Sequence, residues 1–357
     1  MRPPEEVASL IGSIEPAHRA DPALVRERLD HLTKPPGSLG HLEDLALRLA
    51  LIYGDPPPAL RRRVVFVLAA DHGVAQRGVS AYPAAVTAQM CRNFAAGGAA
   101  INAIARTVGA EVVAVDIGVD ADLGDVSGVL HRKVRRGSRD LVSQAALTRE
   151  EAAEAILVGA GLVAERADTV DLVAMGEMGI GNSTVASALT AALTGRAAAE
   201  VVGPGTGVAG DRLVHKCAIV ECAVGRIAGE DDPFEVLRQV GGLELAGLAG
   251  VVLGAARAGR AVVADGFIAT AAALAAARLC PAARDHLFAS HRSAEPGHRV
   301  LLEALGLRPL LDLDLRLGEG TGAALCLPIL DAAGAILREM ATFASARVSG
   351  RTEERCA

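Results

Sequence analysis

Two glycine-rich segments of the 357-residue sequence each carry one glutamate. Glu177 lies in segment 176–184, Gly-Glu-Met-Gly-Ile-Gly-Asn-Ser-Thr, and Glu319 lies in segment 317–323, Leu-Gly-Glu-Gly-Thr-Gly-Ala. A turn that leads into a helix presents backbone N–H groups, which attract anions such as phosphate. A carboxylate in that turn repels phosphate unless it faces another part of the ligand. The pairing therefore indicates a site that binds a phosphorylated molecule and uses carboxylates to move protons.

Each glutamate also has a purely structural interpretation. An acid at the start of a helix complements the helix dipole and stabilises the helix by roughly 0.3–1 kcal/mol. Glycines on both sides of Glu319 favour a functional role, because they let the backbone curl and turn the side chain into a cleft. From these residues alone, both interpretations remain open for Glu177 and Glu319.

A third glycine-rich loop, Gly-Pro-Gly-Thr-Gly at 203–207, precedes Lys216 by about two helical turns. Such a loop can approach a phosphate or a sugar closely, but a tight structural turn explains it equally well. The sequence has no G-x-x-x-x-G-K-[ST] segment, so an ATP-type P-loop is absent, and it lacks the G-x-G-x-x-G dinucleotide fingerprint with a downstream acid.

Metal and hydrolase chemistry receive little support. His72 follows an apolar run directly after Asp71, a position where a hydrogen-bonded structural histidine is commoner than a catalytic one. His291 and His298 flank Ser293 without the spacing of metal ligands, and the six cysteines form no C-x-x-C pair. A G-x-S-x-G elbow is missing. We expect neither a metal nor a cofactor.

The elements that position these residues alternate between short apolar runs and longer Ala-rich runs. We predict strands at 64–69, 111–117, 170–175, 260–264, 286–289 and 309–313, and helices at 83–106, 148–166, 183–194 and from 320 onward. This alternation predicts an α/β fold with an open, mostly parallel sheet of about six strands flanked by helices. Because glycine or polar residues follow every strand, we expect one cleft at the carboxyl ends of the strands.

Both ends of the chain are predicted to be helical. Asp21-Pro22 caps a helix over 24–32, Ser38 caps a second that ends near residue 53, and a last helix covers 328–345. We expect residues 1–58 and 328–357 to form a small helical subdomain beside an α/β catalytic domain of residues 59–327.

Composition narrows the class of protein further. Hydrophobic residues make up 51% of the chain and aromatic residues 2%, so Ala, Val and Leu must build the core. A net charge of −6 argues against a nucleic-acid partner, and the basic run 131–136 lacks interleaved aromatics, which favours a solvated loop over ligand contacts. No signal-type N-terminus or uninterrupted membrane-length apolar run is evident. We expect a soluble, cytoplasmic protein without a membrane partner.

Eight segments together resemble the nicotinate-nucleotide–dimethylbenzimidazole phosphoribosyltransferase family. The resemblance runs from about Lys34 to the last helix, and the order of the segments makes it specific; Ser183 stands where family members often carry Thr. The eight segments are 34–40 (Lys-Pro-Pro-Gly-Ser-Leu-Gly), 70–74 (Ala-Asp-His-Gly-Val), 78–80 (Gly-Val-Ser), 176–184, 203–207, 265–268 (Asp-Gly-Phe-Ile), 290–295 (Ser-His-Arg-Ser-Ala-Glu) and 317–323.

The resemblance implies transfer of phosphoribose from nicotinate mononucleotide to 5,6-dimethylbenzimidazole. The products are nicotinate and α-ribazole 5′-phosphate, which serves the lower ligand of cobalamin. The attacking base must lose its N–H proton, so a carboxylate within hydrogen-bond reach is required. By the motif match this general base is Glu319, and Glu177 serves as a proton relay or a ribose contact.

The resemblance also implies the substrate contacts. Ser80 and Gln89 match positions of the benzimidazole pocket, and family members are homodimers in which segment 34–40 lies close to a site. The substrate-binding positions expected in the glycine-rich turns and beside the phosphate are Gly179, Gly181, Asn182, Ser183, Gly205, Lys216, Gly266, Ser293, Gly318 and Gly320.

Two other classes of protein stay open. One is another nucleotide-handling transferase, such as a nucleoside phosphorylase or a pyrophosphate-dependent phosphoribosyltransferase, although the paired acids before a Thr-rich phosphate loop that mark the latter are missing. The other is a non-catalytic nucleotide sensor, which would need no glutamate in either turn and would bind ligand without turnover.

Overall fold

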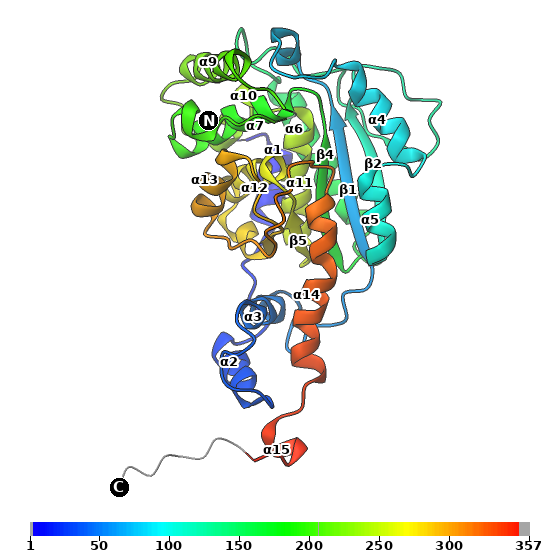
Figure 1. The fold of residues 1–357 in the computed structure, drawn as a ribbon, viewed down its shortest axis with the longest axis vertical. Coiled ribbons are helices and arrows are strands. Elements are labelled where there is room, and N and C mark those ends of the chain that lie inside the picture. The colour runs from blue at the N-terminus through cyan, green and yellow to red at the C-terminus, as the bar shows by residue number, and fades with distance from the viewer. Residues whose placement is uncertain (1–2, 206, 350–357) are drawn as a thin grey trace. The chain divides into compact units, whose positions relative to one another are not determined.

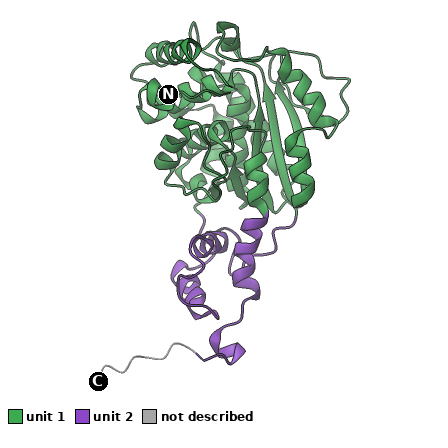
Figure 2. Ribbon diagram, viewed as in Figure 1, with its two compact units in different colours: residues 1–16, 62–327 green, residues 17–61, 328–357 purple. Residues whose placement is uncertain are grey.

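The computed structural model describes residues 3–205 and 207–349, which fall into two compact units (Figure 2). Unit 1 takes in the chain up to residue 16 and residues 62–327, and unit 2 takes in residues 17–61 and those from 328 onward. The N-terminal helix α1 (Glu5–Gly12) contacts α6 and α11. The chain up to residue 16 therefore lies in unit 1, not with the helices of unit 2.

Unit 1 is built on a six-stranded sheet in which every neighbouring pair is parallel, in the order β3-β2-β1-β4-β5-β6. This confirms the predicted α/β class with an open parallel sheet. Strands covered on both faces need apolar side chains throughout, and Val and Ala supply them here. The strands are β1 (Arg63–Ala70), β2 (Ala110–Gly118), β3 (Val129–His131), β4 (Leu172–Met178), β5 (Ala261–Ala264) and β6 (Leu287–Ala289).

One predicted strand was wrong and one real strand was missed. Residues 309–313 form no strand; Leu311 makes a single isolated bridge with His291. Asp314 has a φ of 54°, which breaks the extended backbone, and Leu313 is 54% exposed. The strand that was missed is β3, a three-residue edge strand beside β2, which brings the sheet to six strands.

Helices cover both faces of the sheet (Figure 1). α4 and α5 contact β2 on one face, and α11 packs across β1, β2, β4 and β5 with α6 and α12 against it. The helix predicted over 83–106 is two helices, because Gly97 and Gly98 interrupt it. The helices of the sheet layers are α4 (Ala85–Ala95), α5 (Ala100–Val108), α6 (Arg149–Ala164), α7 (Asn182–Thr194), α8 (Ala198–Val201), α9 (Asp211–Arg226), α10 (Pro233–Val240), α11 (Leu243–Arg257), α12 (Phe267–Leu279) and α13 (Pro296–Leu305), with 3-10 turns at Gly73–Arg77 and Pro281–His286.

The closest helix pair in unit 1 is α6 against α11, and glycines make the approach feasible. A Cβ on Gly159 would overlap the backbone carbonyl of Gly247, and one on Gly250 would overlap that of Ile156. Small residues let two backbones come together and bury the Ala-rich faces that an aromatic-poor sequence provides.

The helix α14 (Thr321–Glu339) begins directly after the Glu319 turn. Its 19 residues and mean hydropathy of 1.4 would suit a membrane span by length and composition, although 56% of that window is buried inside the protein. Burial of this kind is typical of a core helix. The separate helix predicted over 328–345 is the later part of α14 followed by the short α15 (Phe343–Ala346).

Unit 2 has its own small core. Asp21 caps α2 (Pro22–His31) through the N–H of Ala23, as predicted, whereas α3 (His41–Tyr53) starts after Gly40 and not at Ser38. The buried residues that pack together here are Val25, Leu29, Leu32, Ala46, Leu47, Ala50, Ile336 and Leu337.

The basic run 131–136 serves the fold of unit 1. Lys133 Nζ lies 2.9 Å from the buried carboxylate of Asp116, Arg132 pairs with Glu165, and Arg135 pairs with Glu151. These ion pairs tie the run to the rest of unit 1, so it is not simply the solvated loop that the sequence predicted.

Candidate active site

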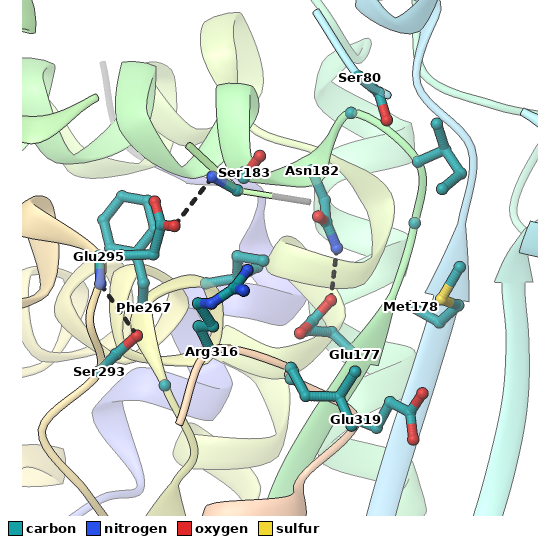
Figure 3. A pocket seen from close by; sticks show the side chains of 18 of the residues that line it. Ser80, Glu177, Met178, Asn182, Ser183, Phe267, Ser293, Glu295, Arg316 and Glu319 are labelled. Carbon is teal, nitrogen blue, oxygen red and sulfur yellow. Dashed lines mark hydrogen bonds between the residues drawn. The ribbon is translucent and has the colours of Figure 1, made fainter. Parts of the chain in front are cut away.

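A cavity of about 310 Å³ lies at the carboxyl ends of the strands (Figure 3), where an open parallel sheet places its ligands. Its walls come from the end of β4, the start of α7, the segments after β5 and β6, and the turn before α14. Of the segments that the sequence predicted to converge, those after β4, β5 and β6 and the Glu319 turn line this cavity, whereas the residues that directly follow β1 and β2 do not. The lining residues are Ser80, Tyr82, Val86, Met90, Glu177–Ser183, Gly205, Gly266–Ile268, His291, Ser293, Glu295 and Arg316–Glu319.

Glu177 belongs to β4 and not to the turn that follows it, because β4 continues to Met178. The side chain is buried, and the Asn182 amide donates a hydrogen bond to its carboxyl group. Burial, with added repulsion from Asp265 and Glu244, raises the pKa of Glu177 to about 8. At neutral pH this carboxyl group therefore holds a proton.

Glu319 lies in the predicted turn, with a positive φ of 63° between Gly318 and Gly320. Burial raises the pKa of Glu319, while the backbone N–H of Ile101 at the start of α5, 3.5 Å away, opposes the rise. Gly318 has a φ of 86°, and a Cβ there would overlap the carboxyl group of Glu177. Glycine at 318 is therefore what lets the two glutamates share one cavity.

Asp265, at the end of β5, anchors the Glu319 turn from behind. Its carboxylate accepts hydrogen bonds from the N–H groups of Gly320 (3.0 Å) and Ala323 (2.9 Å) at the start of α14. Burial raises the pKa of Asp265 to about 7, although these N–H groups oppose the rise. Gly320 thus supports the site and does not line it, contrary to the expected substrate contact.

Lys216 also supports the site from behind. Its side chain is fully buried, and Nζ donates to Ser183 Oγ (3.0 Å) and to the carbonyl of Gly203 (2.9 Å). Burial lowers the pKa of Lys216 to about 8. Lys216 is not among the residues that line the cavity, but it donates a hydrogen bond to Ser183, which is, so its expected contact with phosphate stays a prediction.

Glu295 holds the same loop from the other side. Its Oε1 accepts a hydrogen bond from the N–H of Gly205 at 2.9 Å, and the residue is only 7% exposed (Figure 3). Loop 203–205 therefore lies between a buried cation and a buried carboxylate.

Most of the other expected contacts are brought together in this cavity. Gln89 is the exception, because it is exposed on α4 while Val86 and Met90 of the same helix line the cavity. Residues 86 and 90 are one helical turn apart and share a face, from which residue 89 is rotated. The expected residues that do line the cavity are Ser80, Glu177, Gly179, Gly181, Asn182, Ser183, Gly205, Gly266, Ser293, Gly318 and Glu319.

The site residues expected from the sequence do not include four polar residues of the cavity: Tyr82, His291, Glu295 and Arg316. His291 and Glu295 lie in segment 290–295, which the family resemblance includes as a whole but from which only Ser293 was assigned to the site. Arg316 precedes the Glu319 turn, and it is the one lysine or arginine among the lining residues in the described part of the chain. The apolar lining from Val86, Met90, Met178 and Ile180 has no signal beyond ordinary hydrophobicity.

A hydrogen-bond chain fixes two backbone positions of the cavity. The N–H of Ser293 donates to His298 Nδ1 at 2.9 Å, and Thr270 Oγ1, 3.1 Å from His298 Nε2, donates to the carbonyl of Gly266 at 2.7 Å. Burial lowers the pKa of His298 to about 3, so the ring is neutral and its Nε2–H donates to Thr270. This chain of hydrogen bonds holds Ser293 and Gly266 at fixed positions relative to each other.

His72, the other histidine considered for chemistry, pairs with Glu244. Their Nε2 and Oε1 atoms lie 2.8 Å apart and both side chains are fully buried. This favours the structural role. Across residues 3–205 and 207–349, no three His, Cys, Asp or Glu side chains gather in a way that would hold a metal ion.

Comparisons with known proteins place this chain in a family. A family model described as a phosphoribosyltransferase matches residues 14–348. A nicotinate-nucleotide–dimethylbenzimidazole phosphoribosyltransferase of Chloroflexus aggregans is 52% identical over 345 residues, 96% of this chain and 98% of the relative. One from Geobacter metallireducens is 49% identical over 341 residues, 95% and 96% of the two chains. This chain belongs to the nicotinate-nucleotide–dimethylbenzimidazole phosphoribosyltransferase family.

The solved structures agree with this membership. The crystal structure of CobT from Thermus thermophilus superposes with a TM-score of 0.89 at 52% identity and covers 92% of this chain and 99% of its own. The match confirms the predicted resemblance. Membership of the phosphoribosyltransferase family establishes both the fold and the class of enzyme.

Proposed function

We propose that this chain transfers the phosphoribosyl group of nicotinate mononucleotide to 5,6-dimethylbenzimidazole, giving α-ribazole 5′-phosphate and nicotinate for the lower ligand of cobalamin. The observation that carries the proposal is a single cavity holding two buried glutamates, Glu177 and Glu319, beside the N-terminus of α7. The names of the relatives match this reaction.

The proposed chemistry is one displacement at the anomeric carbon. The benzimidazole nitrogen attacks from the face opposite nicotinate, its bond to carbon forms, and the bond to the pyridine nitrogen breaks with its electron pair leaving on nicotinate. Glu319 takes the N–H proton of the attacking base. Glu177 is a proton relay. Its raised pKa lets it hold a proton at neutral pH, and it exchanges this proton with groups bound in the cavity.

Two halves of the cavity suit the two substrates. The N-terminus of α7, together with Ser183, Ser293 and Arg316, would hold the phosphate, and Lys216 would act through Ser183. Val86, Met90, Met178 and Ile180 offer an apolar wall for the flat benzimidazole beside Ser80. Three further features belong to the proposal: a homodimer, a cytoplasmic location and activity without a metal.

The test is an assay of the purified protein with nicotinate mononucleotide and a panel of benzimidazoles. We expect nicotinate release that depends on the benzimidazole and yields an α-ribotide. A parallel arm offers inorganic phosphate as the only acceptor. Release with phosphate alone would indicate a phosphorylase, and binding of the nucleotide without release in any arm would indicate a sensor.

A further inference from the structure

His291 is a buried histidine of the cavity to which the mechanism gives no task. It follows β6, is 2% exposed, and lines the cavity beside Gly266 and Ser293. Its Nδ1 lies 2.9 Å from Ser290 Oγ. Ser290 donates its one hydroxyl proton to the carbonyl of Asp265 at 2.8 Å. Ser290 therefore accepts from His291, and the proton of the ring sits on Nδ1.

The second nitrogen of the ring is consequently a free acceptor. Burial lowers the pKa of His291 to about 4, so Nε2 carries a lone pair at neutral pH. Among the residues that the structure describes, none donates a hydrogen bond to Nε2. A Cβ on Gly266 would lie 3.3 Å from this nitrogen, so glycine at 266 leaves it uncovered.

The neutral lone pair on Nε2 of His291 can only accept a hydrogen bond, so its partner must be a hydrogen-bond donor. Phosphate oxygens would be repelled by it, whereas a hydroxyl or N–H group is attracted. Both neighbours of His291 at the cavity wall, Gly266 and Ser293, lie on the polar side that would hold the sugar phosphate. The apolar wall for the base comes from α4 and from Met178 and Ile180. The nearest donors of the phosphoribosyl substrate are therefore its ribose hydroxyls.

We propose that His291 accepts, through Nε2, a hydrogen bond from a ribose hydroxyl of the donor nucleotide, and so selects ribose over deoxyribose. The inference rests on the proposed function, because it takes nicotinate mononucleotide as the donor. His291 is then a specificity-determining residue held in its tautomer by Ser290.

Calorimetric binding of nicotinate mononucleotide and of its 2′-deoxy and 3′-deoxy analogues tests the inference without turnover. The unchanged protein should bind one analogue roughly 3–10-fold more weakly than the parent nucleotide, the effect of one neutral hydrogen bond. His291→Asn keeps a donor at the position of Nδ1 and removes Nε2, so it should bind the parent and that analogue equally. His291→Gln places an amide near the position of Nε2 and should retain part of the preference.

His286→Asn is the matched control, because His286 is a buried histidine at the other end of β6, with Nδ1 3.1 Å from the carbonyl of Arg260. It should keep the full preference for ribose. Equal binding of all three nucleotides by the unchanged protein would overturn the inference, as would an undiminished preference in His291→Asn. A base-dependent loss, with weaker benzimidazole binding and unchanged nucleotide binding, would also overturn it. Failure to bind nicotinate mononucleotide at all would instead reject the proposed function.

Discussion

Glu177 and Glu319 line one cavity, yet their surroundings differ in ways that divide the proton chemistry. Glu177 lies among other carboxyl groups and is bonded to Asn182, whereas Glu319 is met by the N–H of Ile101 at a helix start. Like charges hold a proton on a carboxyl group, and a helix N-terminus favours its loss. Glu319 is thus suited to be the base, and Glu177 the group that already holds a proton.

Replacing Glu319 with Gln should lower turnover by roughly 10²–10⁴-fold, the usual contribution of one general base. Folding and binding of nicotinate mononucleotide should be retained, because Gln has the same shape. Steady-state kinetics with dimethylbenzimidazole and calorimetric nucleotide binding check the two parts. Turnover close to that of the unchanged enzyme would remove Glu319 from the role of base.

Replacing Glu177 with Gln should stabilise the protein increasingly as the pH rises from about 5 to 8. The folded pKa of about 8 lies above the ordinary value of 4.5 that holds in an unfolded chain. Across this window the unfolded chain loses the proton and the folded protein keeps it, so the unchanged protein loses stability, at most on the order of 5 kcal/mol. The Gln variant lacks this loss.

Denaturant unfolding at several pH values measures the difference between the two proteins. Glu235→Gln is the control, since Arg238 holds the pKa of Glu235 below its usual range and its contribution should not change over this window. A difference for Glu177→Gln that stays flat with pH would show that the native carboxyl group is ionised.

Replacing Lys216 with Ala should weaken binding of nicotinate mononucleotide and leave the Michaelis constant for the benzimidazole nearly unchanged. The cation polarises and orients the Ser183 hydroxyl, which it contacts at 3.0 Å, toward the anion. In a Ser183→Ala background the same replacement should cost much less, because the two residues act as one unit. Equal shifts for both substrates would assign Lys216 to the fold alone.

At the scale of elements, the close packing of α6 on α11 stabilises the helix layer that covers one face of the sheet. Replacing Gly159 with Ala should destabilise unit 1 by about 1–3 kcal/mol, because its Cβ would meet the backbone of Gly247. Gly161, two residues along the same helix, has open space around its Cβ position, so Gly161→Ala should be neutral or stabilise by about 0.5–1 kcal/mol. Thermal unfolding of the two variants checks this, and equal losses would contradict the packing of α6 on α11.

The elements were predictable where hydrophobic runs are long. β1, β2 and β4 stand out because most of their residues are buried, and a glycine lies at the end of each strand or shortly after it. The edge strand β3 has three residues and merges with a basic run, so no periodicity reveals it. Residues 309–313 show the reverse case: they form an apolar run of the kind that predicts a strand, yet Asp312 and Leu313 are exposed and only one bridge forms.

At the scale of the whole molecule, the alternation of apolar and Ala-rich runs predicted the parallel sheet. The order of eight short segments predicted the family, and the resemblance to that family supplied most of the eleven lining residues that were expected. The sequence did not predict that Lys216 turns inward or that Gln89 turns outward. Those directions depend on which face of α9 or α4 the rest of unit 1 covers. The cavity residues His291 and Arg316 likewise become evident only when segments distant in sequence meet.

The assembled enzyme should need no metal and should invert the anomeric centre. The carboxyl groups of Glu177 and Glu319 can move the protons, and no metal-ligand cluster is found within residues 3–205 and 207–349. Protein dialysed against EDTA should keep its activity, and the anomeric proton coupling of the product should show the α-ribotide. Activity that needs added Mg²⁺ would contradict the first part. A β-configured product would indicate a ribosyl-enzyme intermediate on one of the glutamates.

Tyr82 stands at the rim of the cavity and is 55% exposed, in a chain that has two tyrosines and no tryptophan. The other tyrosine, Tyr53, ends α3 in unit 2. The ultraviolet emission of this protein therefore comes from one ring at the substrate cavity and one in the other unit. A ligand that stacks on or covers Tyr82 changes the emission of one of these two rings, so the unlabelled enzyme carries its own optical reporter of substrate binding.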